Sequence, residues 1–369
     1  MSRRDDLKAA DLYPFIHGLL DRHGLRLELG GMVRDTQAVD STETSTYNWD
    51  YGVTNERLRR LYERAREAQW DAADLPWETS VDLESDVFRL DPAWEAADWF
   101  RKMGRRERQR VVIGYNANLL SNFIHGEQGA LTAAAQLVSA VPDVDGKLYA
   151  ASQTFDEARH VEVFSRYVRE KMPEQFPCTQ NLFNLIQAIT VESRWDFKFL
   201  GMQLIVEGLA VAAFLNLRAR CGEPLLRELI RLVVRDEARH VAFGAISLDG
   251  YYTDMSEAER RERQEFVYEA CVLMQGRLVS GDAYERMGVH PEQVKETLRD
   301  SQETRHFLAL LFSQVVPNLK RVGLLEGWLA ERLAEMDLLR YKDFDADAVL
   351  NQLIRGEDLE HGLSRDIAG

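Results

Sequence analysis

The pentapeptide Asp-Glu-Ala-Arg-His occurs twice in this chain, at residues 156–160 and 236–240, so the two copies lie 80 residues apart. Each copy places a glutamate three positions before a histidine, as Glu157 with His160 and as Glu237 with His240. Side chains three positions apart leave an α-helix as neighbours on one face, so each copy can hold one metal ion. The repeat therefore predicts two helices that present a carboxylate and an imidazole to a shared interior.

A single glutamate stands 30 residues before each copy, Glu127 before the first and Glu207 before the second, both in apolar, alanine-rich stretches. Four buried carboxylates without cations would repel one another and take up protons, whereas two divalent ions would balance their charge. Carboxylate oxygens with one imidazole per ion suit iron or manganese and disfavour a thiolate-type zinc site. We therefore predict a two-metal site with the ligands Glu127, Glu157, His160, Glu207, Glu237 and His240.

The remaining charged residues of each pentapeptide are predicted to support the ligands. A metal-binding imidazole normally donates its other N–H to a carboxylate. Because the two copies face each other, we expect a crossed pattern in which Asp156 binds His240 and Asp236 binds His160. Arg159 and Arg239 could pair with these aspartates, or they could be plain surface charges beside the ligands.

Helical periodicity and the placement of the prolines predict an all-α chain. Four long helices are expected at about 102–140, 147–172, 182–221 and 223–251, with a loop at 173–181 and a further helix at about 55–72. Each long helix carries its glutamates in mid-helix, which places them inside a four-helix bundle. No linker-like segment is present, so we predict one domain, 1–369, with a core at about 102–251 and additional helices in the flanks 1–101 and 252–369.

Bulk composition limits the partners and the compartment. The net charge of −15 disfavours binding to nucleic acid and to anionic membranes. The most apolar long window, 199–217, is interrupted by Gln203, Glu207 and Asn216, which is typical of a helix buried in protein and not of a membrane span. Three widely spaced cysteines without a Cys-x-x-Cys motif, and no signal-type N-terminus, favour a reducing cytoplasm.

The doubled pentapeptide and its two upstream glutamates resemble the ferritin-like di-iron carboxylate superfamily, in its oxygen-activating branch. The resemblance covers about 102–251. It implies a ferritin-like fold and a monooxygenase-type oxidoreductase with two iron ions, or with manganese and iron. Such an enzyme uses dioxygen to hydroxylate, epoxidise, desaturate or N-oxygenate a small organic substrate, with electrons from an external ferredoxin or reductase. A homodimer is also typical of the superfamily.

At several positions the sequence differs from particular enzyme classes of the superfamily, which reduces the number of functions that we expect. Ribonucleotide reductase small subunits usually have a radical tyrosine four residues after the first ligating histidine, where this chain has Phe164. Aromatic amine N-oxygenases carry an extra histidine one turn before the last Glu-x-x-His, where this chain has Val233. Many monooxygenases have a threonine just after the third glutamate, where Ala210 and Val211 stand, so protons would arrive through water or Gln203.

Helical spacing suggests a substrate pocket around the ligands, although ordinary core packing would give the same pattern. The candidate wall residues are Phe123, Leu131, Phe164, Gln203, Val211 and Phe214. An apolar cavity would suit a hydrophobic or aromatic substrate. Two other functions stay open: a manganese/iron ligand-binding oxidase, and a non-catalytic ferritin-like protein that handles iron or peroxide. Storage proteins of the superfamily are near half this length, which favours an enzyme with a shaped pocket.

Overall fold

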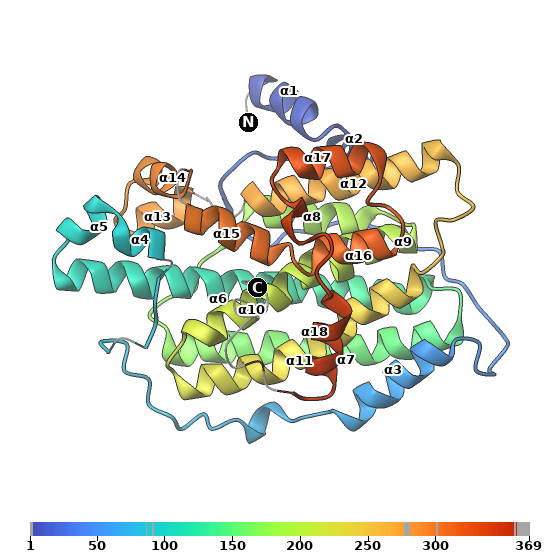
Figure 1. Cartoon of the computed structure of the whole chain (residues 1–369), viewed down its shortest axis with the longest axis horizontal. Helices are drawn as coiled ribbons and strands as arrows, with labels where there is room; N and C mark the ends of the chain where they lie inside the picture. Colours follow the sequence, from blue (N-terminus) through green and yellow to red (C-terminus); the bar gives the residue numbers. More distant parts are fainter. Residues whose placement is uncertain are drawn as a thin grey trace.

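The computed structural model describes residues 3–85, 87–90, 92–276, 281–299, 302–357 and 359. Regular structure in this part is almost entirely helical, and its sheet consists of two short antiparallel strands, β1 (Met32–Val33) and β2 (Cys178–Thr179). The prediction of an all-α chain is therefore confirmed. At the centre lie four long rods (Figure 1): α6 (Arg105–Ala140), α7 (Val144–Lys171), a helix made of η2 (Phe199–Val206) and α10 (Glu207–Arg220), and α11 (Pro224–Ser247).

Local sequence signals set where three of the rods begin. Helix α6 (Arg105–Ala140) starts after Gly104, whose N–H donates to the Glu107 carboxylate over 2.8 Å. Helix α7 (Val144–Lys171) starts after Asp143, whose side chain accepts from the N–H of Gly146. Helix α11 (Pro224–Ser247) has proline at its first position, where the missing N–H costs nothing. These bounds lie within a few residues of the predicted ones except at the end of α11.

The predicted continuous helix at 182–221 is wrong. The segment consists of α8 (Gln180–Val191), a turn, α9 (Trp195–Lys198), the π-helix η2 (Phe199–Val206) and α10 (Glu207–Arg220). Buried Lys198 explains how the turn is stabilised, because its Nζ donates to the carbonyl of Ile189 over 2.9 Å and so satisfies the end of α8. The wide π turns end at Glu207, and π turns often occur next to functional sites.

The flanking segments pack against the bundle. Helix α3 (Glu56–Glu67) contacts α7 and α11, α12 (Glu257–Gly276) contacts α8 and η2, and α18 (Ala346–Ile354) contacts α11 (Figure 1). The other elements are α1 (Arg3–Leu12), α2 (Pro14–Arg22), η1 (Ala72–Asp74), α4 (Pro92–Ala96), α5 (Asp98–Lys102), α13 (Gly281–Met287), α14 (Pro291–Arg299), α15 (Gln302–Leu311), α16 (Val315–Arg321), α17 (Gly327–Glu335) and η4 (Leu339–Tyr341). Buried apolar residues from the rods and both flanks form one core. The single domain 1–369 stays a prediction.

One helical stretch of the described chain, Trp195–Arg220, is long and apolar enough to cross a membrane. It is a central rod of the bundle, and 83% of its most apolar window is buried inside the protein. A core helix of a large helical protein passes the same test of length and composition, and this burial accounts for its apolar character. This burial agrees with the interpretation of the 199–217 window as a core helix.

Candidate metal centre

The six predicted metal ligands lie together in the middle of the bundle, and each is at most 5% exposed. Their ligating atoms form two groups in which all atoms lie within 4.8 Å of one another. One group contains Glu127, Glu157, His160 and Glu237, and the other contains Glu157, Glu207, Glu237 and His240. Glu157 and Glu237 belong to both groups, so their carboxylates would contribute to both metal positions.

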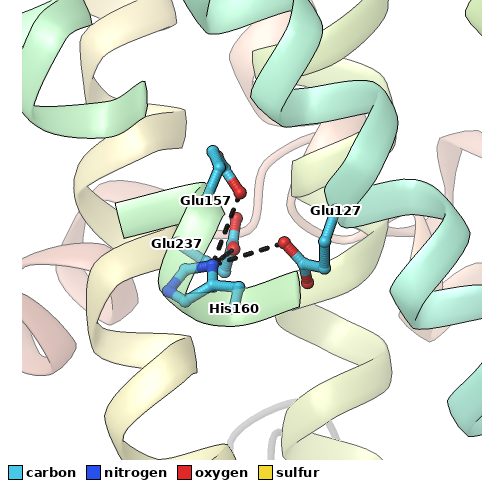
Figure 2. A group of neighbouring side chains, drawn as sticks. All are labelled: Glu127, Glu157, His160 and Glu237. Atoms are coloured by element: carbon cyan, nitrogen blue, oxygen red, sulfur yellow. Dashed lines mark hydrogen bonds and ion pairs between the residues drawn. The ribbon is translucent and has the colours of Figure 1, made fainter. Parts of the chain in front are cut away.

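Both imidazoles turn the Nδ1 atom toward the carboxylates. The Nδ1 atom of His160 lies 3.3 Å from Glu127 Oε2, 3.4 Å from Glu157 Oε2 and 3.0 Å from Glu237 Oε1 (Figure 2). The Nδ1 atom of His240 lies 3.0 Å from Glu157 Oε1 and 3.4 Å from Glu237 Oε2. Each imidazole therefore offers one nitrogen to the shared interior, as the helical spacing of the two motifs predicts.

Several buried atoms at the centre make no hydrogen bond of good geometry: Glu157 Oε2, Glu207 Oε2, both carboxylate oxygens of Glu237, and Nδ1 of His240. Glu207 Oε2 lacks even an ion-pair contact, whereas the others lie 3.0–3.4 Å from an imidazole nitrogen or a carboxylate oxygen. Burying a carboxylate oxygen without a partner is costly, so native structures rarely contain such a cluster without a reason. Two divalent cations among these atoms would satisfy all of them, and the oxygen-rich donor set suits iron and manganese. The residues present therefore fit a two-metal cofactor.

The charges of the cluster also favour cations. Burial raises the pKa of Glu127 and of Glu207 well above the usual value for glutamate, and neighbouring carboxylates raise it further. Burial would lower the pKa of His160 and His240, but the surrounding carboxylates outweigh it and raise both values well above the usual range. Without metal, the cluster thus compensates its negative charge with protons, which metal ions would replace.

The two aspartates of the pentapeptides lie at the histidines of the opposite motif. His160 Nε2 is 3.2 Å from Asp236 Oδ2, and His240 Nε2 is 3.5 Å from Asp156 Oδ2. This is the crossed arrangement that the sequence suggested. A carboxylate at Nε2 fixes the tautomer that leaves Nδ1 free to bind a metal ion.

The two arginines are buried and are not surface charges. Arg159 is 5% exposed, and its Nη2 lies 2.6 Å from Asp156 Oδ1 and 3.0 Å from Asp236 Oδ2. Arg239 is fully buried, donates to Asp236, and lies 3.6 Å from Asp156. The reading of these arginines as plain surface charges is therefore wrong. The positive charges of the two arginines neutralise the two aspartates. The negative charge of the four ligand glutamates must therefore be neutralised by protons or by metal ions.

Two further residues, Gln69 and Trp70, contact the site from a segment that sequence reasoning did not connect with it. Gln69 Nε2 donates to Asp156 Oδ1 over 3.0 Å, and Gln69 Oε1 accepts from Arg159 over 2.8 Å. The indole Nε1 of Trp70 donates to Asp236 Oδ2 over 2.7 Å, and the Arg159 guanidinium lies over its ring at 4.5 Å. No spacing relates these residues to the pentapeptides, so the sequence alone held no signal for them.

Gln153 is another residue that sequence reasoning missed. Its Nε2 donates to Glu157 Oε1 over 3.1 Å and to Glu207 Oε1 over 2.8 Å, and the side chain is fully buried. It precedes Glu157 by four positions and so lies on the same helix face one turn away. That spacing is a signal that could have identified it.

The predicted pocket residues form packed surroundings of the site. The rings of Phe123, Phe164 and Phe214 contact one another, with centroid distances of 5.8, 4.5 and 5.5 Å among the three pairs. Val211 and Gln203 are buried, and Leu131 is half-buried. Cavities of about 780, 610 and 40 Å³ in the described part are lined by none of these six residues. Their role as a substrate wall stays a prediction.

Comparison with known families gives a match over most of the chain. The family described as P-aminobenzoate N-oxygenase AurF matches residues 53–323, a region that contains all six predicted ligands. A search of curated proteins gave no significant match.

Solved structures give distant matches. Dimanganese(II)-NrdF of Streptococcus sanguinis is 14% identical, with 75% of this chain and 92% of that chain covered and a TM-score of 0.49. A variant of an R2-like ligand-binding oxidase with a Mn/Fe cofactor is 18% identical, with 75% and 95% covered and a TM-score of 0.46. The R2-like ligand-binding oxidase of Sulfolobus acidocaldarius is 20% identical, with 68% and 96% covered and a TM-score of 0.41.

Proposed function

The chain belongs to the P-aminobenzoate N-oxygenase AurF family, and we propose that its two metal ions are held by Glu127, Glu157, His160, Glu207, Glu237 and His240. The protein is a ferritin-like di-iron oxidoreductase, with an Fe/Fe or Mn/Fe cofactor, that uses dioxygen and a substrate. The observation that carries the ligand assignment is the pair of four-residue groups that share Glu157 and Glu237.

We propose that the reaction is oxygenation of an amino nitrogen on a small organic substrate. In balanced form, an amine, dioxygen, two electrons and two protons give a hydroxylamine and water. The bound metal ions supply the redox chemistry that activates dioxygen. The two electrons come from an external ferredoxin or reductase, and the protein acts in the cytoplasm.

The side chains around the centre have separate tasks in this proposal. Asp156 and Asp236 orient the imidazoles, and Arg159 and Arg239 hold these aspartates. The contacting rings of Phe123, Phe164 and Phe214 keep bulk water from one end of the site. Protons for the reaction are delivered from the opposite end, where Gln203 Oε1 is buried without a partner and can hold a water molecule.

Val233 favours a second candidate reaction. It is fully buried one turn before Glu237, where aromatic amine N-oxygenases of the superfamily carry an additional histidine. An isopropyl group cannot bind a metal ion, so six side chains and not seven are available to the two ions. The doubled pentapeptide also resembles the motif of monooxygenases and desaturases of the superfamily. Oxidation at carbon is therefore the second candidate.

The two candidates are separated by the product. The iron-loaded protein is reduced without oxygen, mixed with a probe amine such as p-aminobenzoate, and then exposed to ¹⁸O-labelled dioxygen. We expect mass spectrometry to find one labelled oxygen on the nitrogen of the probe, and a labelled carbon would indicate the second candidate. A Glu237→Ala variant, which lacks a carboxylate shared by both ligand groups, is the control. If air oxidised the centre but left every organic probe unchanged, iron or peroxide handling would replace the proposal.

A further inference from the structure

The ligands are of the same residue type at positions 80 residues apart, but the residues one helical turn before the glutamates are not. Four positions before Glu157 stands Gln153, but four positions before Glu237 stands Val233. Likewise Gln203 precedes Glu207 by four positions, whereas Phe123 precedes Glu127. Each pair of positions related by the offset, 153 with 233 and 123 with 203, therefore holds one amide and one apolar side chain.

The amides gather at one end of the site. Gln153 Oε1 lies 3.5 Å from Gln203 Nε2, and both side chains are fully buried. Gly244, one turn after His240, borders the same end, because a Cβ atom built there would lie 2.7 Å from the Cβ of Gln203. Glycine at this position therefore lets the π-helix η2 approach α11 closely.

The other end of the site is apolar. The rings of Phe123, Phe164 and Phe214 contact one another there, and all three side chains are at most 4% exposed. Helices α6 and α7 run antiparallel, so Phe123, which precedes Glu127, lies beside Phe164, which follows His160. The surroundings of the two candidate metal positions are thus chemically different.

Gln153 uses both protons of its amide nitrogen on candidate ligands. One hydrogen bond of 2.8 Å goes to Glu207 Oε1, and one of 3.1 Å goes to Glu157 Oε1. Two carboxylates fix the orientation of the amide, because they can accept from its nitrogen but repel its oxygen. Glu207 Oε2 is left buried without a hydrogen bond, so it is the oxygen free to bind a metal ion.

We propose that Gln153 is a positioning residue that restrains Glu207 to bind its ion through a single oxygen, and that it thereby makes the two metal positions inequivalent. The proposal rests on the metal centre proposed above and adds to it a residue outside the ligand set. It predicts that the affinity for the ion between Glu207 and His240 depends more strongly on Gln153 than the affinity for the other ion. The ion between Glu127 and His160 has no amide partner of this kind among the contacts described.

Anaerobic calorimetric titration of the metal-free full-length protein with Mn²⁺ tests this proposal. We expect two ions per chain, and we expect Gln153→Met to weaken one of them by about 10- to 100-fold while the other changes by less than about threefold. Gln153→Leu also removes the donated hydrogen bonds without adding a charge, and it should weaken binding of the same ion. Val233→Ala, at the related position of the second motif, controls for general disturbance of the core and should change both affinities by less than about threefold.

A double-mutant cycle identifies which ion is affected. In a Glu127→Ala background, Gln153→Met should again weaken binding of the remaining ion by about 10- to 100-fold. In a Glu207→Ala background it should cost less than about threefold, because only the longer 3.1 Å hydrogen bond to Glu157 is then lost. Equal weakening of both ions by the Gln153 variants would indicate a merely structural role and overturn the proposal.

The outcome for the wild type separates this inference from the proposed metal centre. If the wild type bound fewer than two ions, the metal centre itself would be refuted, and this inference with it. If the wild type bound two ions and both Gln153 variants kept both affinities within about threefold, the positioning role alone would be refuted.

Discussion

The indole N–H of Trp70 donates to the same Asp236 oxygen that lies 3.2 Å from Nε2 of His160. These residues come from three segments of the chain, and Trp70 and Asp236 are 166 positions apart. A segment that follows α3 therefore completes the hydrogen-bonding of a histidine in the bundle core. The flank before the bundle supports the metal centre as well as covering it.

Replacing Trp70 with Phe should weaken both folding and metal binding. The variant keeps an aromatic surface under the Arg159 guanidinium but removes a 2.7 Å hydrogen bond to a buried carboxylate. Loss of a hydrogen bond to a charged group costs about 1.5–3 kcal/mol. Urea unfolding should show a loss of that size, and metal analysis should show lower iron retention against a chelator. Unchanged stability together with unchanged retention would mean that Trp70 is only a packing residue.

Helical spacing explains why the site could be predicted from the sequence. Glu157 and His160 must share a face of any helix that contains them, and the repeat supplies a second such pair. Trp70 and Gln69 could not be predicted, because their contacts depend on how α3 docks on the bundle. The π turns before Glu207 could not be predicted either, since an apolar stretch such as 199–206 is compatible with α- and π-type hydrogen bonding.

In the fold too, features set by neighbouring residues could be predicted, and features set by residues distant in the sequence could not. Capping residues such as Asp143 mark the start of a helix in the sequence itself. The break at 192–194 depends on Lys198, whose buried Nζ satisfies the end of α8 and pairs with Glu43 at 2.9 Å. Glu43 lies more than 150 positions before Lys198 in the chain, so no local sequence pattern predicts the break.

Metal uptake should release protons, and affinity should rise with pH. The pKa values of Glu127 and Glu207 are raised by burial, and those of His160 and His240 are raised by the carboxylates around them. The metal-free centre therefore holds protons more tightly than exposed side chains would, and two metal ions must displace them. Calorimetry of Mn²⁺ binding in buffers of different ionisation enthalpy measures the number of protons released. Binding without proton release, equally tight at pH 6 and pH 8, would contradict the prediction.

Replacing Asp236 with Ala should reduce iron occupancy. The change removes the carboxylate at His160 Nε2 and leaves the buried guanidinium of Arg239 without its closest partner. Loss of such an outer partner typically lowers metal affinity by about 10- to 100-fold. Asp249→Ala provides a matched control, because Asp249 pairs with Arg57 at a surface site where both side chains are more than 40% exposed. Equal iron content in the two variants after dialysis against a chelator would rule out the orienting role of Asp236.

Glu269 should make the stability of the protein depend on pH. Its carboxylate accepts from the N–H groups of Phe15 (2.8 Å) and Ile16 (2.7 Å) and so joins α12 to the start of α2. Burial raises the pKa of Glu269 to about 7, against the opposing effect of these two N–H groups. Because the folded protein binds this proton more tightly than the unfolded chain, the contribution is fully present below about pH 4.5 and is lost as pH rises through 7.

A Glu269→Gln variant tests this assignment, because glutamine does not titrate. Both proteins are freed of metal with a chelator, so that the titration of the metal centre is common to them. The wild type should lose up to about 3 kcal/mol more stability than the variant between pH 4.5 and pH 8, as measured by urea unfolding. The variant should be the less stable protein at pH 4.5, where it lacks one accepting oxygen, and the difference should shrink or reverse at pH 8. Parallel stability curves for the two proteins would show that Glu269 does not titrate in this range.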